Sequence, residues 1–166
     1  MRIPRHLPAV VVVAAWLMFI GSFFLPATNV VALAGTKPGT PLTGGQSLAA
    51  ALEVIAVQPL LVLIEPSTLL FLAFPFINLA MLVAPLVAMS REGSALLSLL
   101  LILSGVLPWM LPKEITGDLF VGFYLWDASF LVMSAGCVLA NIRRSQASQE
   151  EIRAANPAGL SRPRET

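Results

Sequence analysis

The residue whose type and position most suggest chemistry is Asp127, a carboxylate inside the apolar run from Phe120 to Arg144. A carboxyl group is costly to keep in hydrocarbon, so such a residue is by default a candidate functional site. Counting inward from Leu119 at about 1.5 Å per residue places Asp127 about 12 Å below the outer edge of its helix. Two interpretations fit it: a proton- or ligand-responsive site, or a polar side chain that holds helices in register by hydrogen bonding.

Polar residues at a similar depth supply candidate partners for this carboxylate. Ser134 and Asn141 follow Asp127 at intervals of seven, so the three share one helix face, which we expect to turn toward protein. Asn78 and Ser104 fall at similar depths in two other apolar runs. The candidate intramembrane polar site is therefore Asp127, Asn78, Ser104 and Ser134. A structural role is favoured, because proton relays normally contain several acidic or histidine residues in series.

Other residue types that carry chemistry stand alone in this sequence. Cys137 is the one cysteine, which excludes an internal disulfide and leaves zinc or iron–sulfur ligation without partners. Glu53 and Glu65 lack the spacing of a cation site. His6 has no neighbouring acid or nucleophile that would suggest catalysis. We therefore expect no metal, no cofactor and no enzymatic activity.

The composition is typical of a membrane-embedded protein. Hydrophobic residues make up 57% of the sequence and charged residues 11%, whereas a soluble domain has roughly 45–50% and 25%. The net charge of +1 is close to neutral and the basic residues are split between the two ends of the chain, so no nucleic-acid-binding surface is predicted. The 166 residues allow four membrane crossings but no additional large soluble domain.

Hydrophobic runs predict an all-α fold: a polytopic membrane protein with a four-transmembrane-helix bundle and an additional outer interfacial helix. The crossings are expected at about 8–25, 67–89, 94–111 and 119–141, and the interfacial helix at about 47–64. Residues 1–144 form the membrane domain, and 145–166 a polar cytoplasmic tail. Proline should start the second crossing at Pro66, and the last helix should continue for two or three turns before stopping at Asn156-Pro157.

Two segments leave alternatives open. The segment 47–64 contains Glu53, Gln58 and Pro59, which favour an interfacial helix over a spanning or re-entrant one. The first apolar run also resembles a signal peptide that would be cleaved at Ala34, although it is longer than a usual signal core. Between these segments, 26–46 is rich in Pro, Gly and Thr, so the backbone is expected to leave both helix and lipid there and to form an exported loop.

The distribution of charge predicts the orientation. With both termini in the cytoplasm, eight arginines are cytoplasmic and two lysines, Lys37 and Lys113, face outward, in agreement with the positive-inside rule. This places the protein in the cell inner membrane as a multi-pass protein. Aromatic residues predicted to form a belt at the outer interface are Trp109, Phe120, Phe123, Tyr124 and Trp126.

A resemblance adds to this interpretation. Gly122-Phe123-Tyr124-Leu125-Trp126, together with Phe24-Leu25-Pro26-Ala27 after the first crossing, resembles short patterns in a group of small four-span bacterial inner-membrane proteins. The resemblance covers most of the chain. It implies the same architecture and no particular activity.

The functional expectation is a non-enzymatic accessory or scaffold subunit that packs against a membrane-protein partner or a copy of itself. The expected surroundings are the lipid bilayer, without nucleic acid. The alternative is a small transporter, channel or proton-responsive membrane protein that uses Asp127. A transport pathway would require polar groups on several helices, whereas the sequence shows one helix with a polar face.

Overall fold

The computed structural model describes residues 3–29, 40–57, 66–90, 94–110 and 118–155. Its helices are α1 (Leu7–Ser22), α2 (Gly44–Val57), α4 (Pro66–Met89), α5 (Ser94–Val106), the 3-10 turn η1 (Leu107–Met110) and α7 (Val121–Ala155). Two short strands, β1 (Pro26–Thr28) and β2 (Leu42–Thr43), complete the described elements. The all-α prediction is confirmed for the class of fold.

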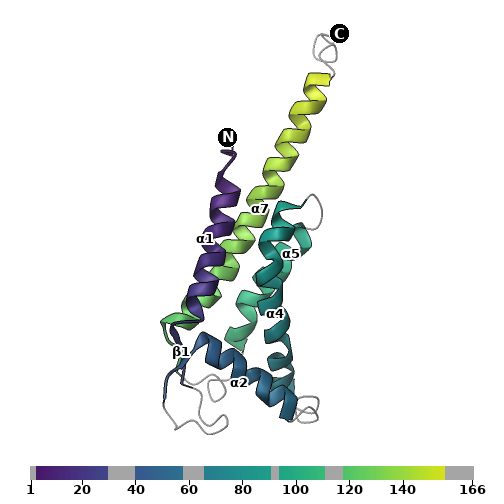
Figure 1. Ribbon diagram of the computed structural model, residues 1–166. Helices are drawn as coiled ribbons and strands as arrows, with labels where there is room; N and C mark the ends of the chain where they lie inside the picture. The colour runs from purple at the N-terminus through teal and green to yellow at the C-terminus, as the bar shows by residue number, and fades with distance from the viewer. Residues whose placement is uncertain (1–2, 30–39, 58–65, 91–93, 111–117, 156–166) are drawn as a thin grey trace.

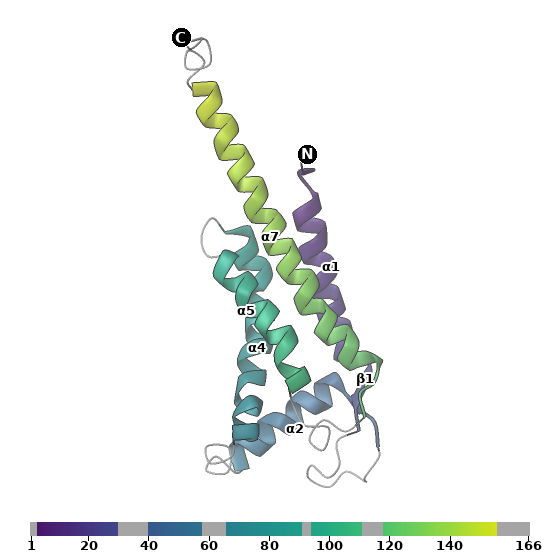
Figure 2. The same ribbon diagram turned by 180° about the vertical axis from the view of Figure 1, so that it is seen from behind.

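Helix α7 is the element around which the others pack. Helix α1 lies along one side of it, α5 lies along another, and α4 packs beside α5 (Figure 1; Figure 2). The centre of the core is apolar and fully enclosed, with Phe19, Met81, Leu101, Phe130 and Met133 without exposed surface. Helices α1, α4, α5 and α7 thus share one core, and α7 contributes to it from Phe123 to Cys137.

Proline sets the helix boundaries as the sequence predicts. Pro66 is the first residue of α4, where its missing N–H removes no helical hydrogen bond. Two further prolines, Pro75 and Pro85, lie inside α4. Helix α7 ends at Ala155, immediately before Asn156-Pro157. It continues for 14 residues after Asn141, somewhat further than the two or three turns expected.

The end of the bundle opposite the two chain termini, called the outer end below, contains strands that the sequence did not reveal (Figure 1). β1 pairs antiparallel with β2, and Thr28 forms a further bridge with Leu119. The Phe120 N–H donates to the Ala27 carbonyl at 2.9 Å. Helix α2 lies across this end (Figure 1). The sequence did not reveal these strands, because strands of three and two residues carry no detectable period. The expectation that 26–46 is free of helix is wrong at its end, because α2 begins at Gly44.

One helix in the described ranges, α7, is long and apolar enough to cross a membrane by length and composition. Shorter apolar helices occupy Leu7–Ser22, Gly44–Val57, Ala73–Ala88 and Ala95–Trp109. The predicted interfacial helix at 47–64 corresponds to α2 as far as Val57. Its remainder, with Gln58 and Pro59, lies outside the described residues, as do Glu65 and the alternative cleavage site at Ala34.

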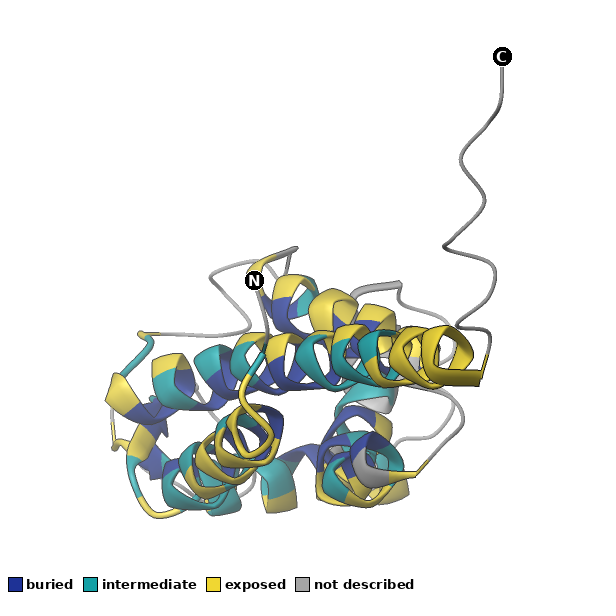
Figure 3. Cartoon of the chain, turned by 90° about the horizontal axis from the view of Figure 1, so that it is seen from above, coloured by how far each residue is buried: buried dark blue, intermediate teal, exposed yellow. Residues whose placement is uncertain are grey.

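The outward faces of these helices are largely aliphatic. Figure 3 shows exposed surface on the sides of the helices that point away from the bundle and buried surface between them. Exposed large apolar side chains include Val10, Val13 and Leu17 of α1; Phe76, Leu79, Leu82 and Leu86 of α4; Leu96, Leu99 and Leu103 of α5; and Leu131, Val138 and Ile142 of α7. The buried polar residues of these helices, such as Asn78, Ser98, Asp127 and Ser134, lie on the faces turned toward the bundle.

Candidate functional site

Asp127 lies in the second turn of α7 and is buried, with 8% of its surface exposed. Its Oδ2 accepts a hydrogen bond from the indole Nε1 of Trp109 at 3.1 Å. Trp109 belongs to η1, the 3-10 turn that extends α5 toward the outer end. The other oxygen, Oδ1, is buried and has no hydrogen-bond partner in the part of the chain that the structure describes. It faces Gly105, where an added Cβ would lie 3.7 Å away.

The expected partners of Asp127 bond elsewhere. The Asn78 side chain donates to the Phe74 carbonyl at 2.8 Å and accepts from the Trp126 indole at 3.0 Å. The Ser104 hydroxyl donates to the Leu100 carbonyl of its own helix at 2.7 Å. The expectation that Asn78 or Ser104 bonds to Asp127 is therefore wrong. Depth along a helix does not fix direction, and Trp126, one residue before Asp127, points about 100° away from it.

Ser134, about two turns after Asp127 on α7, forms a separate contact. Its hydroxyl lies 2.7 Å from the hydroxyl of Ser98 on α5, and both side chains are buried. Ser98 did not enter the sequence-based site, although it interrupts a leucine-rich run on α5. The four predicted site residues thus occupy four separate contacts, and no two of them bond to each other. Asp127 and Ser134 face α5 and η1, Asn78 joins α4 to α7, and Ser104 closes on its own helix.

Two tryptophans supply the donors that replace the expected partners. Trp126 is buried, stacks on Phe74 with 5.6 Å between ring centroids, and packs edge-on against Phe130. Trp109 is 55% exposed and packs against Phe123. The predicted aromatic belt is therefore wrong for Phe123 and Trp126, which belong to the core. The buried indole N–H of Trp126 requires an acceptor, which Asn78 supplies, and the N–H of the more exposed Trp109 bonds to Asp127.

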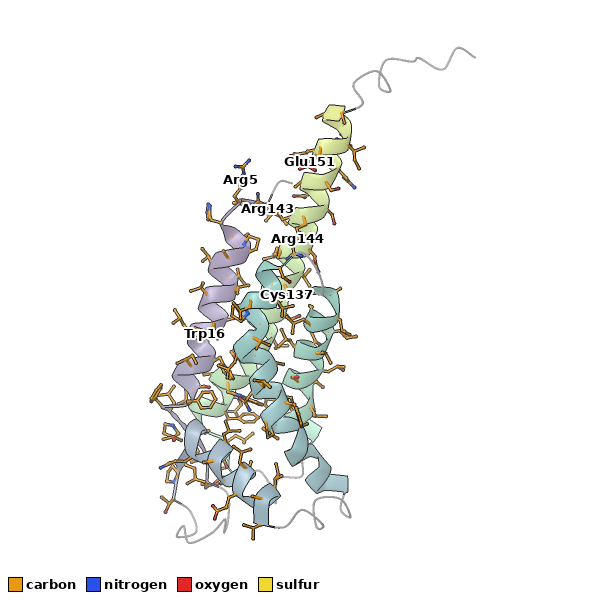
Figure 4. The ribbon with its side chains drawn as sticks, turned by 45° about the vertical axis from the view of Figure 1, so that its right-hand side comes forward. Arg5, Trp16, Cys137, Arg143, Arg144 and Glu151 are labelled. Atoms are coloured by element: carbon orange, nitrogen blue, oxygen red, sulfur yellow. The ribbon has the colours of Figure 1, made fainter. Side chains whose placement is uncertain are left out.

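The end of the bundle at which α1 begins, called the inner end below, holds a different set of groups (Figure 4). The Arg144 guanidinium donates to the Ala88 carbonyl at 2.5 Å, which satisfies an acceptor in the last turn of α4. Cys137, about two turns before Arg144 on α7, is fully buried. The indole Nε1 of Trp16 on α1 is a second buried polar atom without a partner among the described residues. Figure 4 labels these side chains at the inner half of the molecule.

The described ranges contain no group of three or more His, Cys, Asp or Glu side chains that would hold a metal ion. No family model, curated protein or solved structure matches this chain. The site offers two indole–acceptor pairs, one of which contains the buried carboxylate of Asp127, and a serine pair. These are contacts between helices, and they can fix how α4, α5 and α7 pack on one another.

Proposed function

We propose that this chain is a multi-pass protein of a bacterial inner membrane, in which α1, α4, α5 with η1, and α7 all cross the bilayer. The observation that carries the proposal is that the bundle has apolar side chains outside and polar side chains inside, the opposite of a soluble protein. Aliphatic side chains cover the outward faces of these helices, while Asp127, Asn78, Ser98 and Ser134 are turned inward. Contiguous apolar surface of this extent is unusual on a monomeric soluble protein and suits contact with lipid tails.

Helix lengths are compatible with this arrangement. Helix α4 has 24 residues, or about 36 Å at about 1.5 Å per residue, against a hydrocarbon core of about 30 Å. Helix α1 has 16 residues and spans about 24 Å, which a locally thinner bilayer accommodates at modest cost. Helix α5 with η1 covers 94–110 and is similar in length to α1.

The orientation with both termini in the cytoplasm follows from charge and geometry together. The start of α1 and the end of α7 lie at the same end of the bundle, as an even number of crossings requires (Figure 1). The described arginines, Arg5, Arg143, Arg144 and Arg153, belong to this end, which the positive-inside rule assigns to the cytoplasm. Helix α2 then lies at the outer surface.

Reporter fusions test this topology. Alkaline phosphatase is expected to be active when fused after Thr40 or Gly117 and silent when fused after Gly93 or Thr166, because the enzyme folds only on the exported side. Activity at Thr166 would refute the four-span arrangement. Mass determination of the mature N-terminus separately tests cleavage after Ala34.

Within the membrane, we propose a non-enzymatic accessory or scaffold role. The described polar groups of the spans hold helices together and do not converge on a cavity, as a substrate site would require. The last turns of α7, from Ser145 to Ala155, project beyond the bundle and are largely exposed (Figure 1). We assign this arm as the segment that contacts a partner or a second copy.

Purification in a mild detergent tests the accessory role. The full chain is expected to co-purify with a defined partner or as a dimer, and a chain ending at Arg144 is expected to lose that association while remaining folded. Light scattering during gel filtration measures the protein mass in both cases. A full chain that is monomeric and free of other proteins would contradict the proposal.

The unpartnered Oδ1 of Asp127 favours a second candidate function, a proton-responsive membrane protein. The indole of Trp109 bonds to this carboxyl and provides an internal reporter of its protonation. Tryptophan emission of a proton-responsive protein should change between pH 5 and pH 8, and both Asp127→Asn and Trp109→Phe should abolish the change. Emission that is identical at both pH values in the wild type would exclude this candidate.

A further inference from the structure

Helices α1 and α7 run antiparallel, and their contacts fix the register between them. Gly122 lies against the backbone of Pro26, the rings of Phe130 and Phe19 are 6.1 Å apart, and a Cβ added at Gly136 would lie 2.8 Å from Val12 Cγ2. In each pair the two residue numbers sum to 148 or 149. The same register places Arg143 level with Arg5.

Direction along the helix agrees with this placement. Arg143 follows Gly136 by seven residues, so it lies on nearly the same face of α7, and that face packs against α1. Arg5 directly precedes the N-cap residue His6 of α1. Figure 4 shows Arg5 and Arg143 at this end of the helix pair. Arg144 follows Arg143 by one residue, about 100° around the helix, and bonds to α4 instead.

The register thus brings two arginines to the same level of the helix pair, and no carboxylate among the described residues bonds to either. Neither Arg5 nor Arg143 has an ion pair or hydrogen bond to any residue that the structure describes. The first turn of α1 contains no acidic residue, and its partial positive charge adds to theirs. The nearest described carboxylates along α7, Glu150 and Glu151, lie about 10 Å further along the axis. The described parts of α4 and α5 contribute no carboxylate.

We propose that Arg5 and Arg143 bind the phosphate of an anionic phospholipid in the cytoplasmic leaflet. The guanidinium geometry matches a phosphate, and basic sites between transmembrane helices on this side recognise such headgroups. The exposed aliphatic side chains Val10, Val13 and Leu17 begin below the pair and provide a surface for the acyl chains. This inference rests on the proposed membrane orientation. It favours a lipid over a soluble anion because charge and apolar surface adjoin.

Titration of the purified full chain tests the site. In a neutral detergent, native mass spectrometry should show retention of one dioleoyl phosphatidylglycerol per chain and no comparable retention of dioleoyl phosphatidylcholine. Arg5→Gln and Arg143→Gln should each weaken phosphatidylglycerol binding about fivefold, the scale of one basic side chain near an anionic surface. The double variant should bind both lipids equally weakly.

Arg153→Gln is the matched control, because it removes the same charge from an exposed position on the projecting arm of α7. It should leave binding within about twofold of wild type. Equal losses in Arg153→Gln and Arg143→Gln would mean that net charge alone attracts the lipid, and this would overturn the site. Complete competition by soluble glycerophosphate would also overturn it, because the acyl chains would then contribute nothing.

The outcomes separate this inference from the topology on which it rests. If the phosphatase fusion at Thr166 is active, the orientation fails, whatever the lipid titration gives. If the fusions agree but Arg5→Gln and Arg143→Gln bind phosphatidylglycerol like wild type, the lipid site alone fails. Melting temperatures of the variants exclude misfolding, and Arg5→Gln is decisive if Arg143→Gln is unstable, because Arg5 is exposed.

Discussion

Asp127 and Trp109 form the one carboxylate–indole contact among the described residues, and it joins η1 to α7. We expect Asp127→Asn to be nearly neutral, since the amide oxygen still accepts from the Trp109 indole. Asp127→Leu removes the acceptor and leaves that indole unpaired, which should cost about 1 kcal/mol, the scale of interhelical hydrogen bonds in lipid. Thermal unfolding of the two variants in detergent measures the difference.

Trp109→Phe provides the control, because it removes the donor and retains most of the ring. If the hydrogen bond carries the effect, Asp127→Leu should cost much less in a Trp109→Phe background than in the wild type. Equal costs in both backgrounds would show that the side chain of Asp127 stabilises the bundle by other contacts.

At this scale, the sequence predicted which residues turn inward but not what they contact. Asp127 and Ser134 are both buried, as their seven-residue spacing predicts. Their partners, Trp109 and Ser98, depend on how far α5 is rotated about its axis, and depth along a helix does not contain this information. The sequence placed Trp109 at the lipid interface because of its residue type. In the structure its indole N–H donates to Asp127.

Helices α1 and α7 pack closely at Gly136. Of the described glycines that face a side chain, Gly136 leaves the least room for a Cβ. A Cβ at Gly136 would lie 2.8 Å from Val12 Cγ2 and 3.3 Å from Val12 N. Gly136→Ala should therefore force the two helices apart and destabilise the protein by about 1–3 kcal/mol, the usual cost of overpacking. Val12→Ala removes the closest atom and should restore part of the loss in the double variant. Denaturation in detergent measures both.

Gly21→Ala is the matched comparison on the same pair of helices. An added Cβ there would lie 3.9 Å from Leu125 Cδ2, an ordinary contact distance, so a nearly neutral or slightly stabilising effect is expected. A loss of stability as large as that of Gly136→Ala would mean that the close approach of the two helices at Gly136 does not explain the effect of that substitution.

The outer strands are held by a reciprocal pair that links distant parts of the chain. The Asn29 side chain donates to Asp118 Oδ2 at 2.9 Å, and the Asp118 N–H donates back to Asn29 Oδ1 at 2.6 Å. Because the pair is exposed, Asn29→Ala should cost only about 1 kcal/mol. Faster amide exchange at Phe120 than in the wild type would reveal local opening. Unchanged exchange there would show that the backbone bonds suffice.

Elements differ in how well the sequence predicts them. The apolar runs and the prolines predicted the helices and several of their ends, including the start at Pro66 and the stop before Asn156-Pro157. β1 and β2 were missed because they are only three and two residues long, and the bridge from Thr28 to Leu119 forms only where α1 and α7 bring these segments together. Such pairing is a property of the assembled bundle and has no local signature.

For the whole molecule, we expect the thermal stability of the bundle to be independent of the tail after Arg144 but to depend on Arg144 itself. A chain ending at Arg144 should melt within a few degrees of the full chain, because Arg144 still donates to the Ala88 carbonyl. A chain ending at Asn141 should melt lower, since it lacks this donor at the end of α4. Circular dichroism during heating measures both. Equal melting of the two truncations would show that the Arg144 contact contributes nothing.

The length of α7 has a mechanical consequence. Its 35 residues extend about 52 Å, against about 30 Å of hydrocarbon, and no Gly or Pro interrupts it between Cys137 and Ala155. A protein docked at its tip would be held at a set height and at a set angle around the axis. One residue inserted near Ser148 would swing that protein by about 100°, whereas seven would nearly restore its angle about 10 Å further out. If activity requires angle more than height, the seven-residue insertion will work better than the single one.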